Sequence, residues 1–170
     1  MNVVDVVVKR RSIRKYQETP VEKEKLKAIL ETGRLGPSAA NKQPCHIIVI
    51  INPEDRQSLR KAYGADWFIQ APVIIVVCAN PKEAWRRNDR EQYWKVDAAI
   101  CMQNMILVST ELGLGTCWIG AFNEKAAKKV LNVPKEMRVI AMTPLGYPAE
   151  EKEPANDRKP LEKIVHYNKW

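Results

Sequence analysis

Residues 10–16 read Arg10-Arg11-Ser12-Ile13-Arg14-Lys15-Tyr16 and, with Lys9 before them, form a dense cluster of positive charge near the start of the chain. If this segment is helical, Arg10 and Arg14 lie one turn apart and share a face. The planar guanidinium group makes multidentate contacts with phosphate oxygens, so such a pair suits an anionic ligand. Taken alone, such a cluster is more typical of a solvated helix end.

The whole sequence is basic: 28 Lys and Arg residues against 20 Asp and Glu residues give the 170-residue chain a formal net charge of +8. This charge predicts an anionic partner, either nucleic acid or a phosphorylated small molecule. The length and the 45% hydrophobic content predict one compact domain over residues 1–170.

No apolar run approaches the roughly 20 residues of a membrane span, and the longest, Pro72 to Ala79, has the length of a strand. The valine-rich N-terminal stretch contains Asp5 and precedes its arginines, the reverse of a signal peptide. We therefore expect a cytoplasmic protein with no membrane partner. The four cysteines lack a C-x-x-C spacing and the chain has two histidines, so no metal site is predicted.

Turn and capping signals divide the chain into helices and strands. Thr19, Pro20 and Glu22 are typical of a helix start and Gly33 of a helix end, which predicts a helix over 20–32. Asn52-Pro53, Asn80-Pro81 and Asn123 predict three further helix starts. The other predicted elements are strands at 46–51, 73–79, 115–120 and 138–145, a long helix at 93–112, and a proline-rich tail at 148–170. Propensity leaves residues 2–8 open between helix and strand.

Three later segments complete a pattern with residues 10–16. They are Pro37-Ser38-Ala39-Ala40-Asn41-Lys42-Gln43-Pro44, then Leu114-Gly115-Thr116-Cys117-Trp118-Ile119-Gly120, and finally Leu145-Gly146-Tyr147-Pro148 with Arg158-Lys159-Pro160-Leu161. In this order and at these intervals, the four segments resemble the motifs of the nitroreductase-like family of FMN-dependent oxidoreductases. The resemblance covers residues 10 to about 167.

The resemblance implies an α+β nitroreductase-like fold, with a central mixed or antiparallel sheet flanked by helices and a helix over residues 2–8. It also implies a homodimer in which FMN lies at the subunit interface and the C-terminal tail extends onto the partner subunit. The end of the tail, residues 164–170, contains apolar side chains that need a surface to pack on, which agrees with a partner subunit.

The resemblance also implies which residues bind FMN. Those assigned to the phosphate, the ribityl chain or the pyrimidine edge are Arg10, Arg11, Ser12 and Arg14, joined from the tail by Arg158 and Lys159. Those from the other subunit's loop are Pro37, Ser38, Ala39, Asn41 and Gln43, which alone would be ordinary turn formers. Trp118, Ile119 and Gly120 are assigned to the flavin ring, with backbone N–H groups of Ile119 and Gly120 toward its N5 and O4.

The expected activity follows from the cofactor, whose N5 carries the chemistry, so no protein side chain is assigned as catalytic. NADH or NADPH is expected to reduce FMN, and a nitroaromatic, quinone or similar small molecule to accept the electrons. Gly113-Leu114-Gly115 is not a dinucleotide fingerprint, because it lacks the third glycine. Two alternatives stay open: another flavin reaction (dehalogenation, dehydrogenation or flavin modification), and a basic nucleic-acid-binding domain, which would need aromatic platforms or a reading helix.

Overall fold

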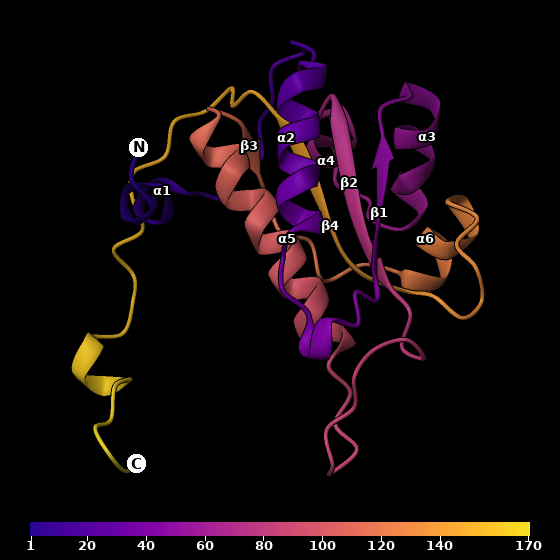
Figure 1. Ribbon diagram of the computed structural model, residues 1–170. Helices are drawn as coiled ribbons and strands as arrows, with labels where there is room; N and C mark the ends of the chain where they lie inside the picture. Colours follow the sequence, from indigo (N-terminus) through magenta and orange to yellow (C-terminus); the bar gives the residue numbers. More distant parts are fainter.

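The computed structural model describes residues 1–170, and a four-stranded antiparallel sheet lies at its centre (Figure 1). The strand order is β1-β2-β4-β3, with bounds β1 Cys45–Ile50, β2 Val73–Ala79, β3 Gly115–Thr116 and β4 Arg138–Gly146. Every neighbouring pair is antiparallel. The predicted α+β architecture with a central sheet flanked by helices is confirmed.

Helices cover both faces of the sheet. The α-helices are α1 Val3–Lys9, α2 Lys23–Arg34, α3 Pro53–Ser58, α4 Asp66–Gln70, α5 Trp94–Glu111 and α6 Glu124–Val130, and three short 3-10 turns are η1 Ala39–Asn41, η2 Leu59–Lys61 and η3 Leu161–Lys163. The two long helices, α2 and α5, pack together across one face, in front of the sheet in Figure 1. The shorter α3, α4 and α6 lie toward the other face.

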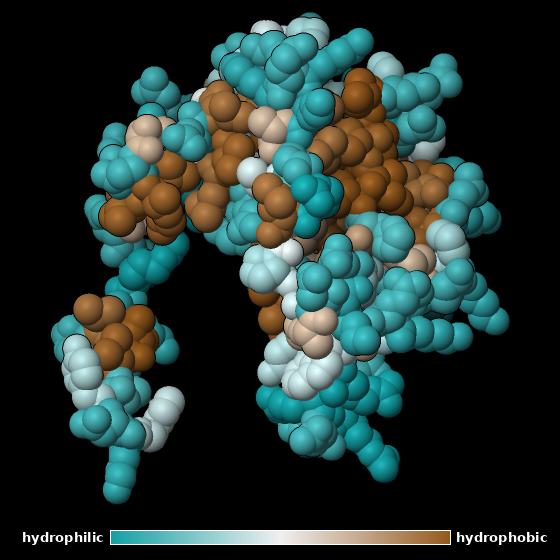
Figure 2. Space-filling model, in the orientation of Figure 1, coloured by the Kyte–Doolittle hydropathy of each residue, from teal (hydrophilic) through white to brown (hydrophobic).

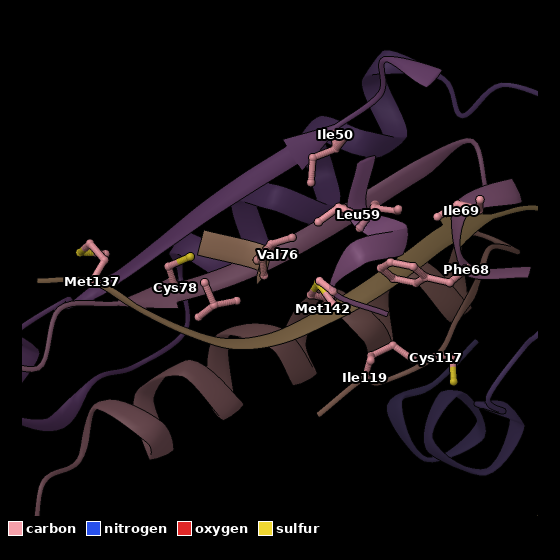
Figure 3. Close-up of a cluster of buried hydrophobic side chains, with 14 residues drawn as sticks. Ile50, Leu59, Phe68, Ile69, Val76, Cys78, Cys117, Ile119, Met137 and Met142 are labelled. Atoms are coloured by element: carbon pink, nitrogen blue, oxygen red, sulfur yellow. The ribbon is translucent and has the colours of Figure 1, made fainter. Parts of the chain in front are cut away.

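The hydrophobic core lies on both faces of the sheet, so β2 is buried along its whole length. Side chains alternate across a strand, so Val73, Ile75 and Val77 pack toward α2 and α5. Ile74, Val76 and Cys78 belong to the opposite layer, with Leu59 and Phe68 among the side chains drawn in Figure 3. This two-sided burial explains why residues 73–79 form a continuous apolar run, and that predicted strand is confirmed.

The predicted start and end of the second helix were wrong. The helix begins at Lys23 rather than Pro20, and the Thr19 hydroxyl contacts the side chain of Gln17 instead of capping it. Gly33 lies inside α2 and does not end it, because α2 packs closely on α5 there: a Cβ at Gly33 would lie 2.9 Å from Met105.

Two other elements differ from the sequence prediction. Asn80-Pro81 starts no helix: the Asn80 side chain accepts the backbone N–H of Lys82 as a cap would, but only a turn follows. The chain then forms the arm of residues 81–93, which projects from the lower end of the view in Figure 1. The predicted strand 115–120 is paired only at residues 115–116, with a single further bridge from Ile119 to Met142. The caps at Asn52 and Asn123 and the long helix at 93–112 are confirmed.

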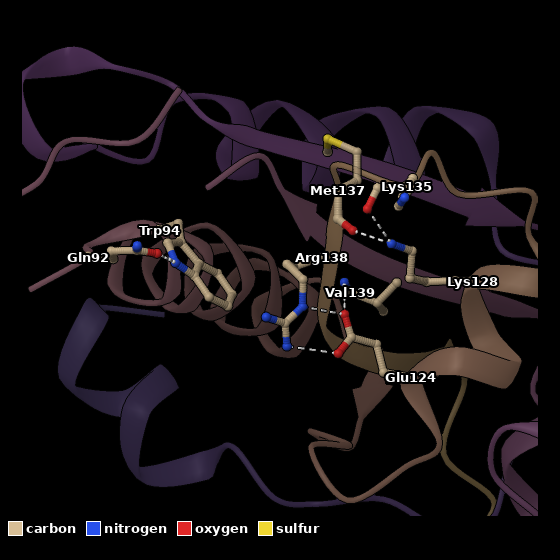
Figure 4. Close-up of polar contacts among 8 residues, drawn as sticks. All are labelled: Gln92, Trp94, Glu124, Lys128, Lys135, Met137, Arg138 and Val139. Atoms are coloured by element: carbon tan, nitrogen blue, oxygen red, sulfur yellow. Dashed lines mark hydrogen bonds and ion pairs between the residues drawn. The ribbon is translucent and has the colours of Figure 1, made fainter. Parts of the chain in front are cut away.

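An ionic contact joins α6 to β4 (Figure 4). The Glu124 carboxylate accepts from the Arg138 guanidinium at 2.7 Å and from the Val139 backbone N–H at 3.0 Å. The Arg138 contact is the main reason that the pKa of Glu124 is lowered. Arg138 also lies over the ring of Trp94 at 5.1 Å, so the same side chain reaches the first residue of α5.

The C-terminal tail leaves the body of the molecule (Figure 1). Residues 156–170 are all exposed, including the apolar side chains of Ile164, Tyr167 and Trp170. None of the helices combines the length and apolarity that a membrane-spanning segment requires.

Candidate functional site

The basic N-terminal segment is extended, so its predicted helical geometry was wrong. Helix α1 ends at Lys9, and Ser12 forms a parallel bridge with Thr116 of β3. The backbone N–H of Ile13 donates to the carbonyl of Thr116 at 2.9 Å. In extended backbone alternate residues share a face, so Arg10 and Arg14 still lie on one side, and Ser12 joins them.

Arg11 lies on the other side of this segment with Ile13, which is buried against Gly115. Both line a cavity of about 540 Å³ that is also lined by Lys152 and by three glutamates, Glu150, Glu151 and Glu153. The Nε atom of Arg11 is buried and has no hydrogen-bond partner. A Cβ at Gly115 would come within 2.8 Å of Ile13, so glycine is what allows the basic segment to approach β3 this closely.

The arginines of this segment have no carboxylate partner within the chain. None of Arg10, Arg11 and Arg14 forms an ion pair within the chain. The guanidinium carbon of Arg14 instead lies 5.8 Å from the centre of the Trp67 ring. No role for Trp67 was predicted from the sequence. Arg10 and Arg14 share one side of the segment and have no carboxylate partner, which fits an anionic group such as a phosphate.

Glu150 and Lys152 hold the basic segment in its extended form, and sequence reasoning missed both. The Glu150 carboxylate accepts the backbone N–H of Arg14 at 2.6 Å, and the Lys152 ammonium donates to the carbonyl of Ser12 at 2.8 Å. The two side chains also pair with each other at 3.1 Å. Only their opposite charges, two residues apart in the sequence, indicated that they could pair.

Residues 118–120 follow β3 along the same edge of the sheet. Trp118 is 38% exposed, whereas Ile119 is buried. The N–H of Ile119 already donates to the Met142 carbonyl at 2.8 Å, so of the two predicted ring contacts only the N–H of Gly120 is free. A Cβ at Gly120 would meet nothing closer than Trp118, at 3.6 Å, so the surface beside this N–H is open.

The polar loop of residues 37–44 is folded tightly on itself. Ala40, Asn41 and Gln43 have positive φ angles of 50°, 52° and 49°, in the left-handed region that side chains disfavour. The Ser38 hydroxyl accepts the Gln43 N–H at 2.8 Å, and the N–H of Ala39 donates to Asp97 of α5 at 2.9 Å. Pro37 enters this loop and is exposed.

The loop and the basic segment lie at opposite ends of α5. Ala39 contacts Asp97 in the first turn of the helix, whereas Ile13 pairs with Thr116, which follows its last turn. At 1.5 Å per residue, the 18 residues of α5 span about 27 Å. One chain therefore does not bring the two predicted halves of the site together.

The tail residues Arg158 and Lys159 also lie apart from the basic segment. Both are exposed, and the Arg158 guanidinium donates to the carbonyl of its neighbour Asp157 at 2.5 Å. The tail is fixed to the body only up to Lys152, through its contact with Ser12.

An antiparallel sheet between two helical layers, with arginines that form no ion pair along one edge, defines the class of this α+β protein. Known structures give this fold a name. The crystal structure of a nitroreductase family protein from Clostridium difficile 630 matches it with a TM-score of 0.93 and 34% sequence identity, covering 100% of both chains. The sequence model of the nitroreductase family matches residues 7–64 and 56–147. The chain belongs to the nitroreductase family.

The names of other relatives indicate related chemistry. A protein of Archaeoglobus fulgidus that is 35% identical over 97% of both chains has a name that joins NADH dehydrogenase and NAD(P)H nitroreductase. An FMN-dependent nitroreductase from Clostridium difficile R20291 is 34% identical, with a TM-score of 0.85 over 98% of this chain and 99% of that one. The FMN reductase [NAD(P)H] of Bacillus subtilis is 29% identical over 96% of this chain and 72% of its own.

Proposed function

We propose that this protein is an FMN-dependent oxidoreductase that takes electrons from NADH or NADPH and passes them to a nitroaromatic, quinone or similar small acceptor. The observation that carries the proposal is the cluster of Arg10, Arg11 and Arg14, which has no ion-pair partner in the chain. The relatives named FMN reductase and NAD(P)H nitroreductase support the cofactor and the electron donor.

The residues of the basic segment fit a mononucleotide. A phosphate monoester carries about −1.5 to −2 charges at pH 7, which the arginines neutralise. Arg10 and the Ser12 hydroxyl bind the phosphate and the ribityl chain from the open face of the segment. The buried Nε of Arg11, which lacks a partner, is a further donor on this segment. Arg158 and Lys159 complete the phosphate site when the tail folds onto it.

The residues around the flavin ring orient it and tune it. When bound, FMN accepts and donates a hydride at N5. Gly120 offers a free backbone N–H to the ring, and its missing Cβ permits close approach. Arg14 is assigned to the pyrimidine edge, where its positive charge would stabilise the reduced, anionic form of the flavin. No protein side chain has to attack the substrate in this scheme.

A homodimer completes the site, because the polar loop lies about 27 Å away in the same chain, at the far end of α5. Pro37, Ser38, Ala39, Asn41 and Gln43 of one subunit then contact the flavin bound to the arginines of the other. Exposed apolar side chains support this assembly: Figure 2 shows them gathered over α1, which exposes Val3, Val4, Val7 and Val8. The adjoining apolar groove of about 330 Å³ continues onto Leu35 and Leu107.

A visible spectrum of the purified protein tests the cofactor directly. Flavin absorption bands that bleach anaerobically on addition of NADH or NADPH, and return when an acceptor is added, support the proposal. Nitroaromatics, quinones, free flavin and halogenated phenols, each assayed with both donors, identify the acceptor. A colourless protein that takes up no FMN and binds DNA with a steep salt dependence would overturn it in favour of a nucleic-acid-binding role.

Substitutions in the basic segment test the phosphate contact. We expect Arg10→Ala to weaken FMN binding roughly 10- to 100-fold, because a charge-assisted hydrogen bond contributes about 1.5–3 kcal/mol. Lys15→Ala is the matched control, since it removes the same charge from an exposed side chain on the opposite side of the extended segment. Titration of the apoprotein with FMN, followed by fluorescence quenching, measures both. Equal effects of the two substitutions would mean that bulk charge, and not a specific contact, holds the phosphate.

A further inference from the structure

Asp97 is a buried carboxylate in the first turn of α5, and the site described so far gives it no task. It is 2% exposed, in a helix whose other buried side chains are almost all apolar. Its Oδ1 accepts the backbone N–H of Ala39 at 2.9 Å, whereas its Oδ2 is buried without a hydrogen-bond partner. Burial of a carboxylate is unfavourable unless its contacts compensate, so the position of Asp97 needs an explanation.

The loop that Asp97 contacts is under backbone strain. Three of its non-glycine residues, Ala40, Asn41 and Gln43, have left-handed backbone angles. Such conformations persist only where surrounding contacts hold them, and they concentrate at functional sites. Within the loop, the N–H groups of Asn41 and Lys42 donate to the carbonyls of Ser38 and Ala39. These bonds close the loop on itself but do not attach it to the body of the protein.

Two hydrogen bonds link the loop of residues 37–44 to distant parts of the chain: the Asn80 N–H donates to the Pro44 carbonyl at 2.9 Å, where the loop enters β1, and the Ala39 N–H donates to Asp97 of α5. The second bond joins positions 58 residues apart in the sequence. Ser38, Gln43 and Asp97 line the same cavity of about 340 Å³ beside the loop. The Oδ1 atom of Asp97 is therefore the one acceptor on α5 that holds the loop by a hydrogen bond.

We infer that Asp97 is a positioning residue for the flavin-binding loop, which sets Ser38, Asn41 and Gln43 at the angle needed to contact the flavin of the partner subunit. This inference rests on the proposed function. Asp97 acts through its Oδ1, and its negative charge is not required, because Oδ2 has no partner. A favourable interaction with the positive end of the helix dipole explains an acid in the first turn of α5, but it does not explain the contact with Ala39.

Two substitutions separate the acceptor from the charge. Asp97→Asn keeps an oxygen acceptor for the Ala39 N–H and removes the charge, whereas Asp97→Ala removes both. Ser109→Ala is the matched control, because it deletes a buried side-chain hydrogen bond near the other end of the same helix. We expect Asp97→Ala to weaken FMN binding at least 10-fold. Asp97→Asn and Ser109→Ala should stay within about threefold of the unsubstituted protein.

A second experiment measures the protease sensitivity of the loop in the absence of flavin. Lys42 is exposed in the loop, so trypsin cleavage after Lys42 in the apoprotein, followed by mass spectrometry, reports how firmly the loop is held. We expect Asp97→Ala to be cleaved there at least fivefold faster, and the other two variants to resemble the unsubstituted protein. If the unsubstituted protein takes up no FMN, the proposed function fails while this measurement still tests the tether.

Three results would overturn the inference. The first is unchanged cleavage at Lys42 in Asp97→Ala, which would mean that the loop is held by other contacts. The second is an Asp97→Asn variant as defective as Asp97→Ala in both assays, which would make the charge the important feature. The third is an equal loss of FMN affinity in Ser109→Ala, which would reflect general destabilisation of α5.

Discussion

At the scale of single residues, glycine has two different roles in this chain, and the structure separates them. A Cβ at Gly33 would lie 2.9 Å from Met105 and 3.1 Å from Ile47, whereas a Cβ at Gly64 would have no neighbour within 4 Å. Gly33 lets α2 and α5 approach each other, while Gly64 lies in open space. The free energy of unfolding should therefore respond in opposite ways to the same substitution at these two positions.

We expect Gly33→Ala to lower the free energy of unfolding by about 1–3 kcal/mol, as is typical of an overpacked core. Gly64→Ala should leave it unchanged or raise it by up to about 1 kcal/mol, because alanine restricts the unfolded chain. Urea denaturation of both variants measures the difference. Loss of stability at Gly64 alone would contradict the packing described between α2 and α5.

The element scale shows where sequence patterns suffice and where they do not. The strand at Val73–Ala79 and the caps at Asn52 and Asn123 could be predicted, because their signals are local. The extended form of residues 10–14 could not be predicted, since it depends on the pairing of Ser12 with Thr116, which is distant in the sequence. Sequence motifs predicted the segments of the proposed site, but their placement at the two ends of α5 follows from tertiary packing alone.

Glu150 and Lys152 of the tail form hydrogen bonds with residues 12–14, and the contribution of Glu150 to the free energy of unfolding depends on pH. A hydrogen bond from the Arg14 N–H is the main reason that the pKa of Glu150 is lowered, followed by contact with Lys152. A carboxyl group whose pKa is lower in the folded state stabilises that state above its unfolded pKa, near 4.3. This contribution is lost as the pH falls through the lowered folded value.

Glu150→Gln keeps an oxygen acceptor for the Arg14 N–H but removes the charge. We therefore expect it to reduce the free energy of unfolding at pH 7 by about 0.5–1.5 kcal/mol, because a hydrogen bond to a charged acceptor contributes more than one to a neutral acceptor. The difference from the unsubstituted protein should shrink as the pH falls below about 4, where Glu150 itself becomes protonated. Urea denaturation between pH 7 and pH 3 measures it. Glu151→Gln, a neighbouring exposed carboxyl group, is the control and should show no such trend. A constant difference at every pH would contradict the role given to the Glu150 charge.

At the scale of the whole molecule, the structure places the two segments of the proposed flavin site far apart in one chain. The basic segment lies along the β3 edge of the sheet, and the polar loop lies beyond the other end of α5. In the proposed homodimer, two-fold symmetry would bring the loop of each chain to the flavin of the other and make two equivalent sites. The exposed apolar surface of α1 provides a place for the chains to meet.

Mixed dimers test this sharing of the site. One variant, Arg10→Ala with Arg14→Ala, loses the basic half, and another, Asn41→Gly with Gln43→Gly, loses the loop side chains while glycine keeps the left-handed backbone. Each homodimer should bind FMN poorly. Random association of the two variants makes about half of the dimers mixed, and each mixed dimer has one intact site, so about one quarter of the full flavin content should return. Absorbance of bound flavin after co-refolding measures it, and no recovery would mean that each site is built from a single chain.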